Sequence, residues 1–173
     1  MGGEARVVAL RPEDEPQDKP EQEPAAGARP LRMLPLPALD RVGVVLVSHS
    51  PALAEATARL AVELLGTGDP APVATAGGTI DGGTGTSAVL VLAAARQADQ
   101  GMGVAVLADL GAAVRTVRGL LAEAEARGLP FPTRFADAPF VEGAIAAVAT
   151  ASAGGDLAAV IEAAEDGYLV RKT

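Results

Sequence analysis

The 173-residue chain is 49% apolar but only 2% aromatic, so Ala, Val and Leu must form most of its core. This composition suffices for one domain and suits helices packed closely on a parallel sheet. The net charge is −8 and Lys19 and Lys172 are the only lysines, so no basic stripe is available to neutralise phosphates. We therefore expect no nucleic-acid partner.

The chain has no cysteine and a single histidine, His49. Disulfides, thiolate metal sites and histidine-rich metal sites are therefore excluded. No apolar run approaches the roughly 20 residues of a membrane span, and the N-terminus lacks an apolar core typical of a signal peptide. We expect a cytoplasmic protein with no membrane segment, no metal and no bound cofactor.

The first 40 residues differ from the rest of the chain. They hold more than half of the 13 prolines, interleaved with Glu, Asp and Gln, and Arg11 to Glu23 contains almost no apolar residue. Such a segment cannot bury enough apolar surface to offset the entropy of ordering. The composition predicts a disordered extension over 1–40 and a folded domain over 41–173. A docking role for the acidic segment is the alternative.

From Arg41 onward, strand and helix signals alternate. Leu53, Ala56, Leu60 and Leu64 recur at helical spacing and share one face of the first helix, which Gly66 ends. Thr86 or Ser87 is the natural N-cap of the second helix. The patterns predict strands at 42–47, 71–75, 104–107 and 133–135, and helices at about 51–65, 87–98, 112–127, 141–151 and 156–165.

This alternation predicts an α/β fold, a doubly wound and mainly parallel sheet of order 2-1-3-4 with helices on both faces. The helices after the first and third strands then leave on opposite faces, which opens a crevice at the carboxyl ends of those strands. His49 follows the first strand and Asp109 ends the third. The topology therefore predicts that the only imidazole and a carboxylate meet in this crevice.

A carboxylate that accepts a hydrogen bond from one ring nitrogen fixes the tautomer and leaves the other nitrogen free to attack. His49 and Asp109 are thus candidates for a nucleophilic histidine and the residue that orients it. The alternative is that His49 caps the helix beginning at Pro51, as Ser48 and Ser50 also could, and that Asp109 is a turn residue.

The second unusual stretch is the loop Gly77-Gly-Thr-Ile-Asp-Gly-Gly-Thr-Gly-Thr-Ser87. Its hydroxyls and backbone N–H groups, ahead of a helix N-terminus, could cradle an anion. It lacks the lysine of a Walker A loop and does not match the dinucleotide-binding fingerprint. The alternative is a flexible surface loop. A Ser-His-Asp hydrolase is not indicated, because no Gly-x-Ser-x-Gly elbow occurs.

The chain resembles the DhaM family, the phosphotransferase subunits of phosphoenolpyruvate-dependent dihydroxyacetone kinase, which are similar to mannose-type enzyme IIA domains. The resemblance covers residues 42–173. It rests on the glycine-rich loop and on three further motifs, Val42-Gly-Val-Val-Leu-Val-Ser-His-Ser50, Val104-Ala-Val-Leu-Ala-Asp-Leu-Gly-Ala112 and Ala138-Pro-Phe-Val-Glu-Gly-Ala144.

The resemblance implies a phosphotransferase subunit that carries phosphohistidine. His49 would accept a phosphoryl group from an HPr-type phosphocarrier, with phosphoenolpyruvate as the ultimate source. It would pass the group to ADP bound on the DhaL subunit, whose ATP phosphorylates dihydroxyacetone on DhaK. Asp109 matches the acidic partner of the histidine. Residues expected to line the phosphate site are Ser48, Ser50, Gly78, Thr79, Asp81, Gly82, Thr86, Ser87 and Gly111.

The resemblance also implies a homodimer, a mannose-type enzyme IIA fold and a last antiparallel strand, for which Tyr168 to Val170 is the candidate. Pro139, Phe140 and Glu142 match a further motif, expected near the site at most. Two alternatives remain: an enzyme IIA serving a sugar transporter, and a regulatory domain switched by histidine phosphorylation. The Gly-Gly-Thr-x-Asp-Gly loop favours the kinase partner.

Overall fold

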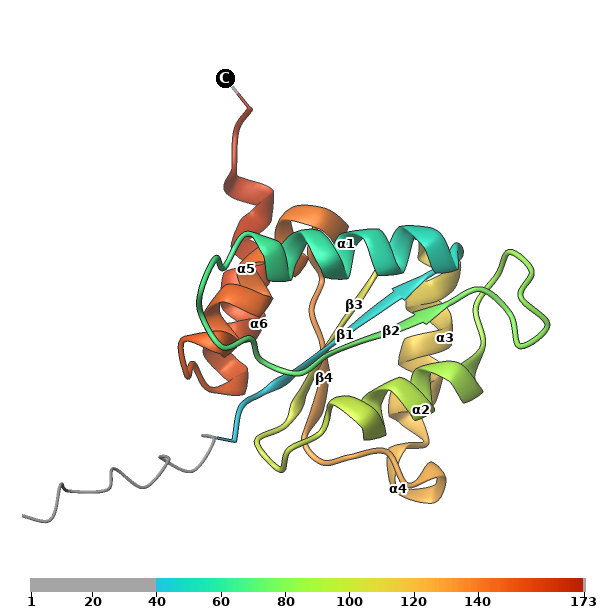
Figure 1. Cartoon of the computed structure of the whole chain (residues 1–173). Coiled ribbons are helices and arrows are strands. Elements are labelled where there is room, and N and C mark those ends of the chain that lie inside the picture. Colours follow the sequence, from blue (N-terminus) through green and yellow to red (C-terminus); the bar gives the residue numbers. More distant parts are fainter. Residues whose placement is uncertain (1–39, 173) are drawn as a thin grey trace, which may run out of the picture. The chain divides into compact units, whose positions relative to one another are not determined.

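The computed structural model describes residues 40–172, so the extension predicted for 1–40 lies almost wholly outside the described residues. The domain is built on a four-stranded parallel sheet of order β2-β1-β3-β4 (Figure 1). Its strands are β1 (Gly43–Ser48), β2 (Val73–Gly77), β3 (Val104–Ala108) and β4 (Thr133–Phe135). The predicted α/β fold and strand order are confirmed.

Helices cover both faces of the sheet (Figure 1). On one face, Val44 and Leu46 pack in a core with α1, α5 and α6, and on the other Val45 and Val47 pack with α2 and α3. This alternation reflects the period of two along a strand. The helices are α1 (Pro51–Glu63), α2 (Ala88–Ala98), α3 (Gly111–Ala122), α4 (Ala124–Arg127), α5 (Phe140–Ser152), α6 (Leu157–Glu165) and the 3₁₀-helix η1 (Asp166–Leu169).

Small residues let the helices approach the sheet closely. A Cβ atom added to Gly43 would lie only 2.3 Å from the carbonyl oxygen of Ala98 in α2. The side of α2 that faces the sheet consists largely of alanines and is buried. Because the chain has few aromatic residues, small side chains fill the interface between α2 and the sheet, and the helix packs closely against the strands. None of the helices within residues 40–172 has the length and apolarity needed to cross a membrane.

Three leucines, two in α1 and one at its C-cap, lie on the outer side of the helix rather than against the sheet. Leu53, Leu60 and Leu64 are 43%, 40% and 62% exposed, whereas the buried residues of α1 are Ala54, Thr57 and Ala61. The side of the helix that packs on the sheet therefore carries small side chains. The periodicity of the leucines marks the outer face of α1.

Two element boundaries differ from the expected ones for local reasons. The strand β2 begins at Val73 rather than near residue 71, because Pro70 and Pro72 have no N–H to donate to a sheet ladder. The single helix expected over 112–127 is divided at Glu123, whose backbone leaves the helical region, and the short α4 ends at Gly128 in the left-handed conformation.

The expected antiparallel last strand is wrong. Tyr168 and Leu169 lie in η1, and the chain then leads away from the sheet (Figure 1). The reason lies in the local contacts of this segment. Gly167 is buried against Pro139, the Tyr168 hydroxyl donates to Asp137 at 3.3 Å, and Lys172 forms an ion pair with Glu142. In residues 40–172 the sheet therefore ends at β4 and is entirely parallel.

Candidate active site

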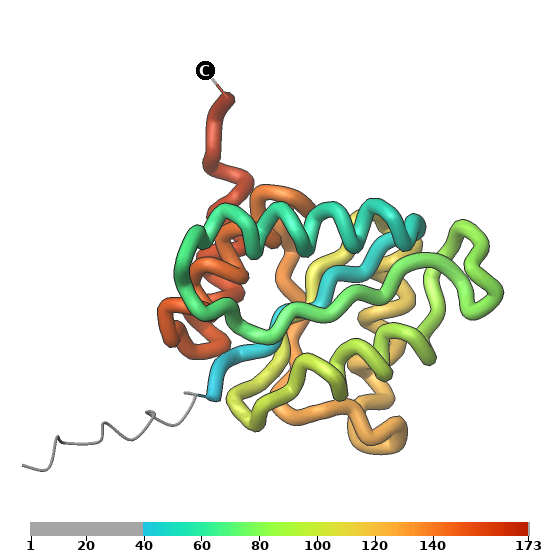
Figure 2. Tube along the Cα trace, in the orientation of Figure 1, coloured from blue at the N-terminus to red at the C-terminus, as the bar shows by residue number. Residues whose placement is uncertain are grey.

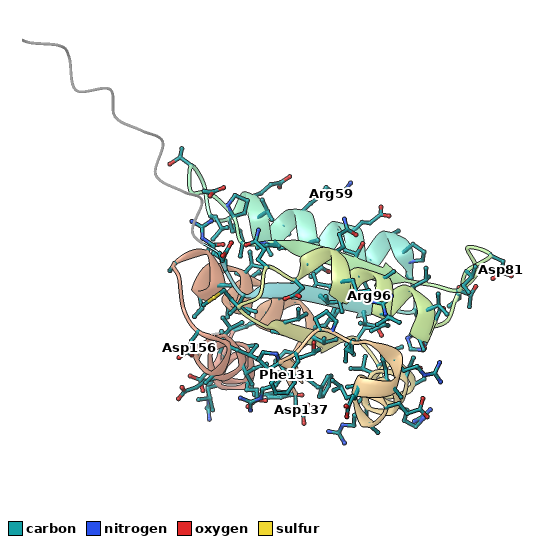
Figure 3. The ribbon with its side chains drawn as sticks, turned by 90° about the horizontal axis from the view of Figure 1, so that it is seen from below. Arg59, Asp81, Arg96, Phe131, Asp137 and Asp156 are labelled. Atoms are coloured by element: carbon teal, nitrogen blue, oxygen red, sulfur yellow. The ribbon has the colours of Figure 1, made fainter. Side chains whose placement is uncertain are left out.

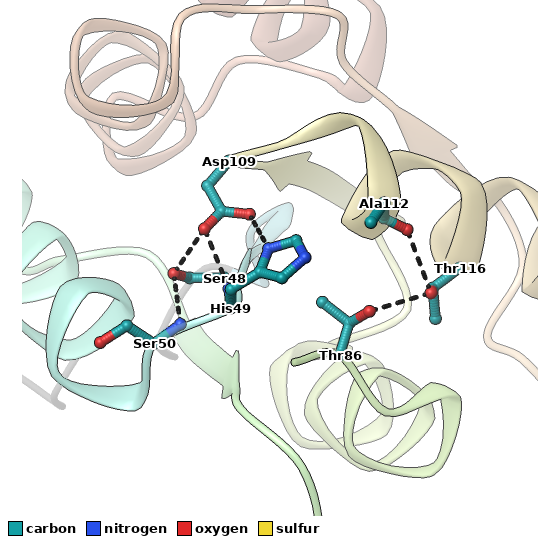
Figure 4. Close-up of polar contacts among 7 residues, drawn as sticks. All are labelled: Ser48, His49, Ser50, Thr86, Asp109, Ala112 and Thr116. Carbon is teal, nitrogen blue, oxygen red and sulfur yellow. Dashed lines mark hydrogen bonds and ion pairs between the residues drawn. The ribbon is translucent and has the colours of Figure 1, made fainter. Parts of the chain in front are cut away.

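His49 and Asp109 lie side by side because they follow neighbouring parallel strands. Val47 of β1 pairs with Ala108 of β3, and the Asp109 N–H donates to the Val47 carbonyl at 3.1 Å. This register brings the next residues of both strands to one edge of the sheet. There the His49 Nδ1 and the Asp109 Oδ1 are 3.0 Å apart (Figure 4).

The Asp109 carboxylate is held by several donors. Its Oδ2 accepts from the Ser48 hydroxyl at 2.8 Å and from the His49 backbone N–H at 2.9 Å. The buried Ser48 oxygen in turn accepts from the Ser50 N–H at 3.0 Å. Burial raises the pKa of Asp109, but the bonds from the His49 backbone, the His49 ring and Ser48 outweigh it and leave this pKa below its usual range. Asp109 is therefore ionised at neutral pH.

An ionised carboxylate can only accept hydrogen bonds, so Nδ1 of His49 carries the proton that is shared with Asp109. In the neutral ring the lone pair then lies on Nε2, which makes no hydrogen bond to any residue of 40–172. The side chain is 21% exposed. Figure 4 shows that Nε2 points to the space flanked by Ala112 and Thr86. The free nitrogen of the imidazole is thus oriented and accessible.

The first turn of α3 borders the same space. The side chain of its N-cap residue, Leu110, accepts no hydrogen bond from the helix. Val114 is the first residue of the helix whose N–H donates to a backbone carbonyl, that of Leu110. The N–H groups of Gly111 and Ala112, two residues that are not buried, are therefore available to a ligand, whereas Ala113 is fully buried. Because a helix N-terminus combines such donors with the positive end of the helix dipole, it is suited to hold an anion next to Nε2.

A pair of threonines lies beside this turn. The Thr86 and Thr116 hydroxyls are 3.0 Å apart, and the Thr116 hydroxyl also donates to the Ala112 carbonyl at 3.2 Å (Figure 4). Thr86 was expected at the site from the sequence, but Thr116 was not. In the sequence, the only sign of a role for Thr116 is that it lies one helical turn after Ala112. This spacing can be interpreted only when α3 is known to begin at the site.

Ser50 and Ser87 cap helices. The Ser50 hydroxyl accepts from the Leu53 N–H of α1, and the Ser87 hydroxyl accepts from the Leu90 N–H of α2, both at 3.4 Å. Of the two proposed caps of α2, Ser87 is the one used. Both hydroxyls therefore satisfy backbone donors at the edge of the sheet.

The glycine-rich loop is attached to the backbone around His49 at both of its ends. The Gly78 N–H donates to the Ser48 carbonyl and the Gly85 N–H to the His49 carbonyl, each at 3.0 Å. Gly78 has a φ of +73°, and a Cβ atom there would lie 2.5 Å from the Gly83 carbonyl oxygen. Gly85, which was not singled out from the sequence, thus helps to fix the position of His49.

The middle of this loop projects away from the sheet before it returns to α2 (Figure 2). Thr79 donates to Asp81, which lowers the pKa of that exposed carboxyl group, and Gly82 forms the turn with a φ of +84°. Asp81 lies at the outer end of the molecule (Figure 3). Neither Thr79 nor Asp81 is hydrogen-bonded to His49 or Asp109 within the described chain, so the structure does not bring them together with the imidazole.

The motif at residues 138–144 makes contacts other than those of the His49 site. Pro139 is the N-cap residue of α5, Phe140 is the first residue of this helix, and Glu142 pairs with Lys172. This ion pair lowers the pKa of Glu142. None of these residues is hydrogen-bonded to His49 in the structure of residues 40–172. Pro139, next to Gly167, and Glu142, paired with Lys172, connect the start of α5 to the C-terminal segment.

A cavity of about 820 Å³ lies elsewhere in the described residues. Leu121, Leu129, Phe131 and Phe135 line it between α3, α4 and β4, and it includes no residue of the His49 site. Within residues 40–172 no cluster of three His, Asp or Glu residues could hold a metal ion.

Comparison with known proteins identifies the family. Residues 43–161 match the family model EIIA-man, described as the PTS system fructose IIA component. A phosphoryl donor subunit DhaM of a PEP-dependent dihydroxyacetone kinase 2 from Listeria innocua is 31% identical over 106 residues, which are 61% of this chain and 82% of that protein. A DhaM phosphoryl donor subunit from Pantoea ananatis is 36% identical over 128 residues, which are 71% of this chain.

The match to the Pantoea protein spans only 26% of that protein. A crystal structure of a protein of unknown function, EF1359, superposes with a TM-score of 0.60 at 26% identity and covers 73% of this chain and 94% of its own. These matches confirm the resemblance found in the sequence motifs. The chain belongs to the EIIA-man family of enzyme IIA components of the phosphotransferase system and is DhaM-like.

Proposed function

We propose that the chain acts as a phosphoryl carrier through Nε2 of His49. Family membership supports the carrier role, and one observation supports the choice of atom. Asp109 occupies Nδ1 at 3.0 Å, whereas Nε2 faces the open first turn of α3. The nitrogen that can attack is thus next to donors that can hold a phosphoryl group.

In the proposed step, the Nε2 lone pair attacks phosphorus in line with the bond to the donor. The Nε2–P bond forms, the donor's N–P bond breaks, and its electron pair returns to the donor ring. His49 loses no proton, because Nδ1–H remains bonded to Asp109. The positive charge that develops on the ring is stabilised by this carboxylate, and the N–H groups of Gly111 and Ala112 receive the phosphoryl oxygens.

The proposed donor is a phosphorylated HPr-type phosphocarrier, charged from phosphoenolpyruvate. The proposed acceptor is ADP on a DhaL subunit, with DhaK downstream, because both similar proteins named above are DhaM phosphoryl donor subunits. In the second step, a terminal phosphate oxygen of ADP attacks phosphorus and the electron pair of the N–P bond returns to Nε2. We propose that the chain acts in the cytoplasm as a homodimer.

One reconstitution tests both steps. The chain is incubated with phosphoenolpyruvate, enzyme I and HPr, and then with ADP-loaded DhaL, DhaK and dihydroxyacetone. We expect label on His49 and formation of dihydroxyacetone phosphate, with His49→Ala unlabelled. Labelling of His49→Ala contradicts the carrier proposal altogether. Label that reaches His49 but never the triose contradicts the kinase assignment.

The description of the matching family model, a fructose IIA component, favours a sugar transporter as the second candidate destination. The same labelled chain separates the two acceptors when it is offered either DhaL with ADP or a mannose-type enzyme IIB. We expect transfer to ADP. Transfer to the enzyme IIB alone would establish the transporter function.

A further inference from the structure

We infer that Thr116 is a positioning residue, which holds the hydroxyl of Thr86 away from His49 until a phosphoryl group arrives there. The inference rests on the proposed phosphorylation of His49 and extends it to a residue of α3 that has no direct part in that chemistry. It is carried by the hydrogen-bond chain that links Thr86, Thr116 and Ala112.

The direction of this chain follows from proton counting. Each threonine hydroxyl has one proton. The Thr116 hydroxyl donates its proton to the Ala112 carbonyl at 3.2 Å, one turn back along α3, a common bond for a threonine within a helix. In the bond of 3.0 Å between the two hydroxyls, Thr116 is therefore the acceptor and Thr86 the donor. The single proton of Thr86 is committed to Thr116.

The side chain of Thr86 has two branches, and their positions differ. Its hydroxyl is turned to Thr116, and Figure 4 shows that its methyl group lies on the side nearer the His49 ring. Rotation of χ1 between staggered positions moves a threonine hydroxyl by about 120° without moving the backbone. Such a rotation is sufficient to change the direction in which Thr86 donates its proton.

A phosphoryl group on Nε2 supplies an acceptor that is stronger than Thr116. A hydrogen bond to a charged oxygen is roughly twice as strong as one between neutral groups. We therefore expect Thr86 to leave Thr116 and donate to a phosphoryl oxygen when His49 is phosphorylated. When the phosphoryl group leaves, Thr86 returns to Thr116. The threonine pair thus has two arrangements, and the occupancy of His49 decides between them.

The first test observes Thr86 directly and needs no partner protein. Phosphoramidate phosphorylates histidine chemically, and three-bond couplings to the Thr86 methyl carbon, measured by NMR, report its χ1 rotamer. We expect the rotamer to change when His49 is modified. In Thr116→Val we expect the phosphoryl-facing rotamer to be populated before modification, whereas the matched control Thr116→Ser behaves as wild type. An unchanged Thr86 rotamer, or a His49 that phosphoramidate does not modify, overturns the inference.

The second test measures the equilibrium of phosphoryl exchange with phospho-HPr. Thr116→Val removes a bond made only in the resting state, so we expect the equilibrium constant for phosphorylation to rise about fivefold. In a Thr86→Val background the same substitution is expected to change nothing, which a purely structural role of Thr116 would not produce. If Thr116→Val changes the equilibrium constant equally in the wild-type and Thr86→Val chains, the inference is overturned. If phospho-HPr does not label wild-type His49, the proposed function fails, while the phosphoramidate test remains decisive for Thr116.

Discussion

Asp109 binds His49 at two points, the backbone N–H through Oδ2 and the ring Nδ1 through Oδ1, at 2.9 and 3.0 Å. A single carboxylate therefore fixes both the position of the residue and the tautomer of its ring. The Ser48 hydroxyl also donates to Oδ2, so the carboxylate that follows β3 is hydrogen-bonded to the last residue of β1 as well. The reactive nitrogen is thus oriented by the junction of two strands.

The first prediction concerns the tautomer. Asp109→Asn preserves the size of the side chain but offers an amide, which can donate to Nδ1 and place the ring proton on Nε2. We expect the rate of His49 phosphorylation by phospho-HPr to fall on the order of 100-fold or more, as for other histidines that lose an orienting carboxylate. The exposed Asp166→Asn serves as the control and should keep the wild-type rate. An Asp109→Asn chain phosphorylated at the wild-type rate contradicts the role of this carboxylate.

The second prediction concerns acid stability. The pKa of Asp109 is lower in the folded chain than its ordinary value of 3.8, so its ionised form stabilises the fold above that value. This contribution is lost as the pH falls below about 4 and through the folded pKa. We expect urea unfolding between pH 2.5 and 6 to show a steep loss of stability at the acid end, and a shallower one in Asp109→Asn. An equal loss of stability on acidification in the wild-type chain and in Asp109→Asn would contradict the prediction.

A third prediction addresses the close contact between β2 and the start of α1. A Cβ atom on Gly77 would lie 2.4 Å from the Cα of Pro51, which leads directly into the helix after His49. We expect Gly77→Ala to lower the free energy of unfolding by about 2 kcal/mol or more, because backbone must move on both sides. Gly119→Ala is the matched control, since nothing lies within 4 Å of its added Cβ in α3. This control should stabilise the chain by about 0.5–1 kcal/mol.

The fold and the central pair could be predicted from the sequence, because both follow from the order of elements. Alternating strands and helices determine the parallel sheet, and that sheet brings the residues after β1 and β3 together. Thr116 could not be found in this way, since its importance depends on the rotation of α3 about its axis. Nor could the end of the chain be predicted. Tyr168 to Val170 has a strand-like composition, but η1 follows α6 at once, and the Tyr168 hydroxyl donates to Asp137.

The outward-facing side of α1 gives the last prediction. The leucine periodicity indicates an apolar face, but Leu60 is 40% exposed whereas its neighbour Ala61 is fully buried. We expect Leu60→Gln to cost less than about 1 kcal/mol in the free energy of unfolding of the isolated chain. Ala61→Gln, the same side chain one residue later, must force a larger polar group against the sheet and should cost about 3 kcal/mol or more.

Urea denaturation at several protein concentrations measures both α1 variants. A large loss in Leu60→Gln that grows with protein concentration would mean that a second copy covers Leu53, Leu60 and Leu64, because only association makes apparent stability depend on concentration. A large loss independent of concentration would contradict the exposed position of Leu60. The same comparison thus measures the packing of α1 and tests whether its leucines lie at a subunit interface.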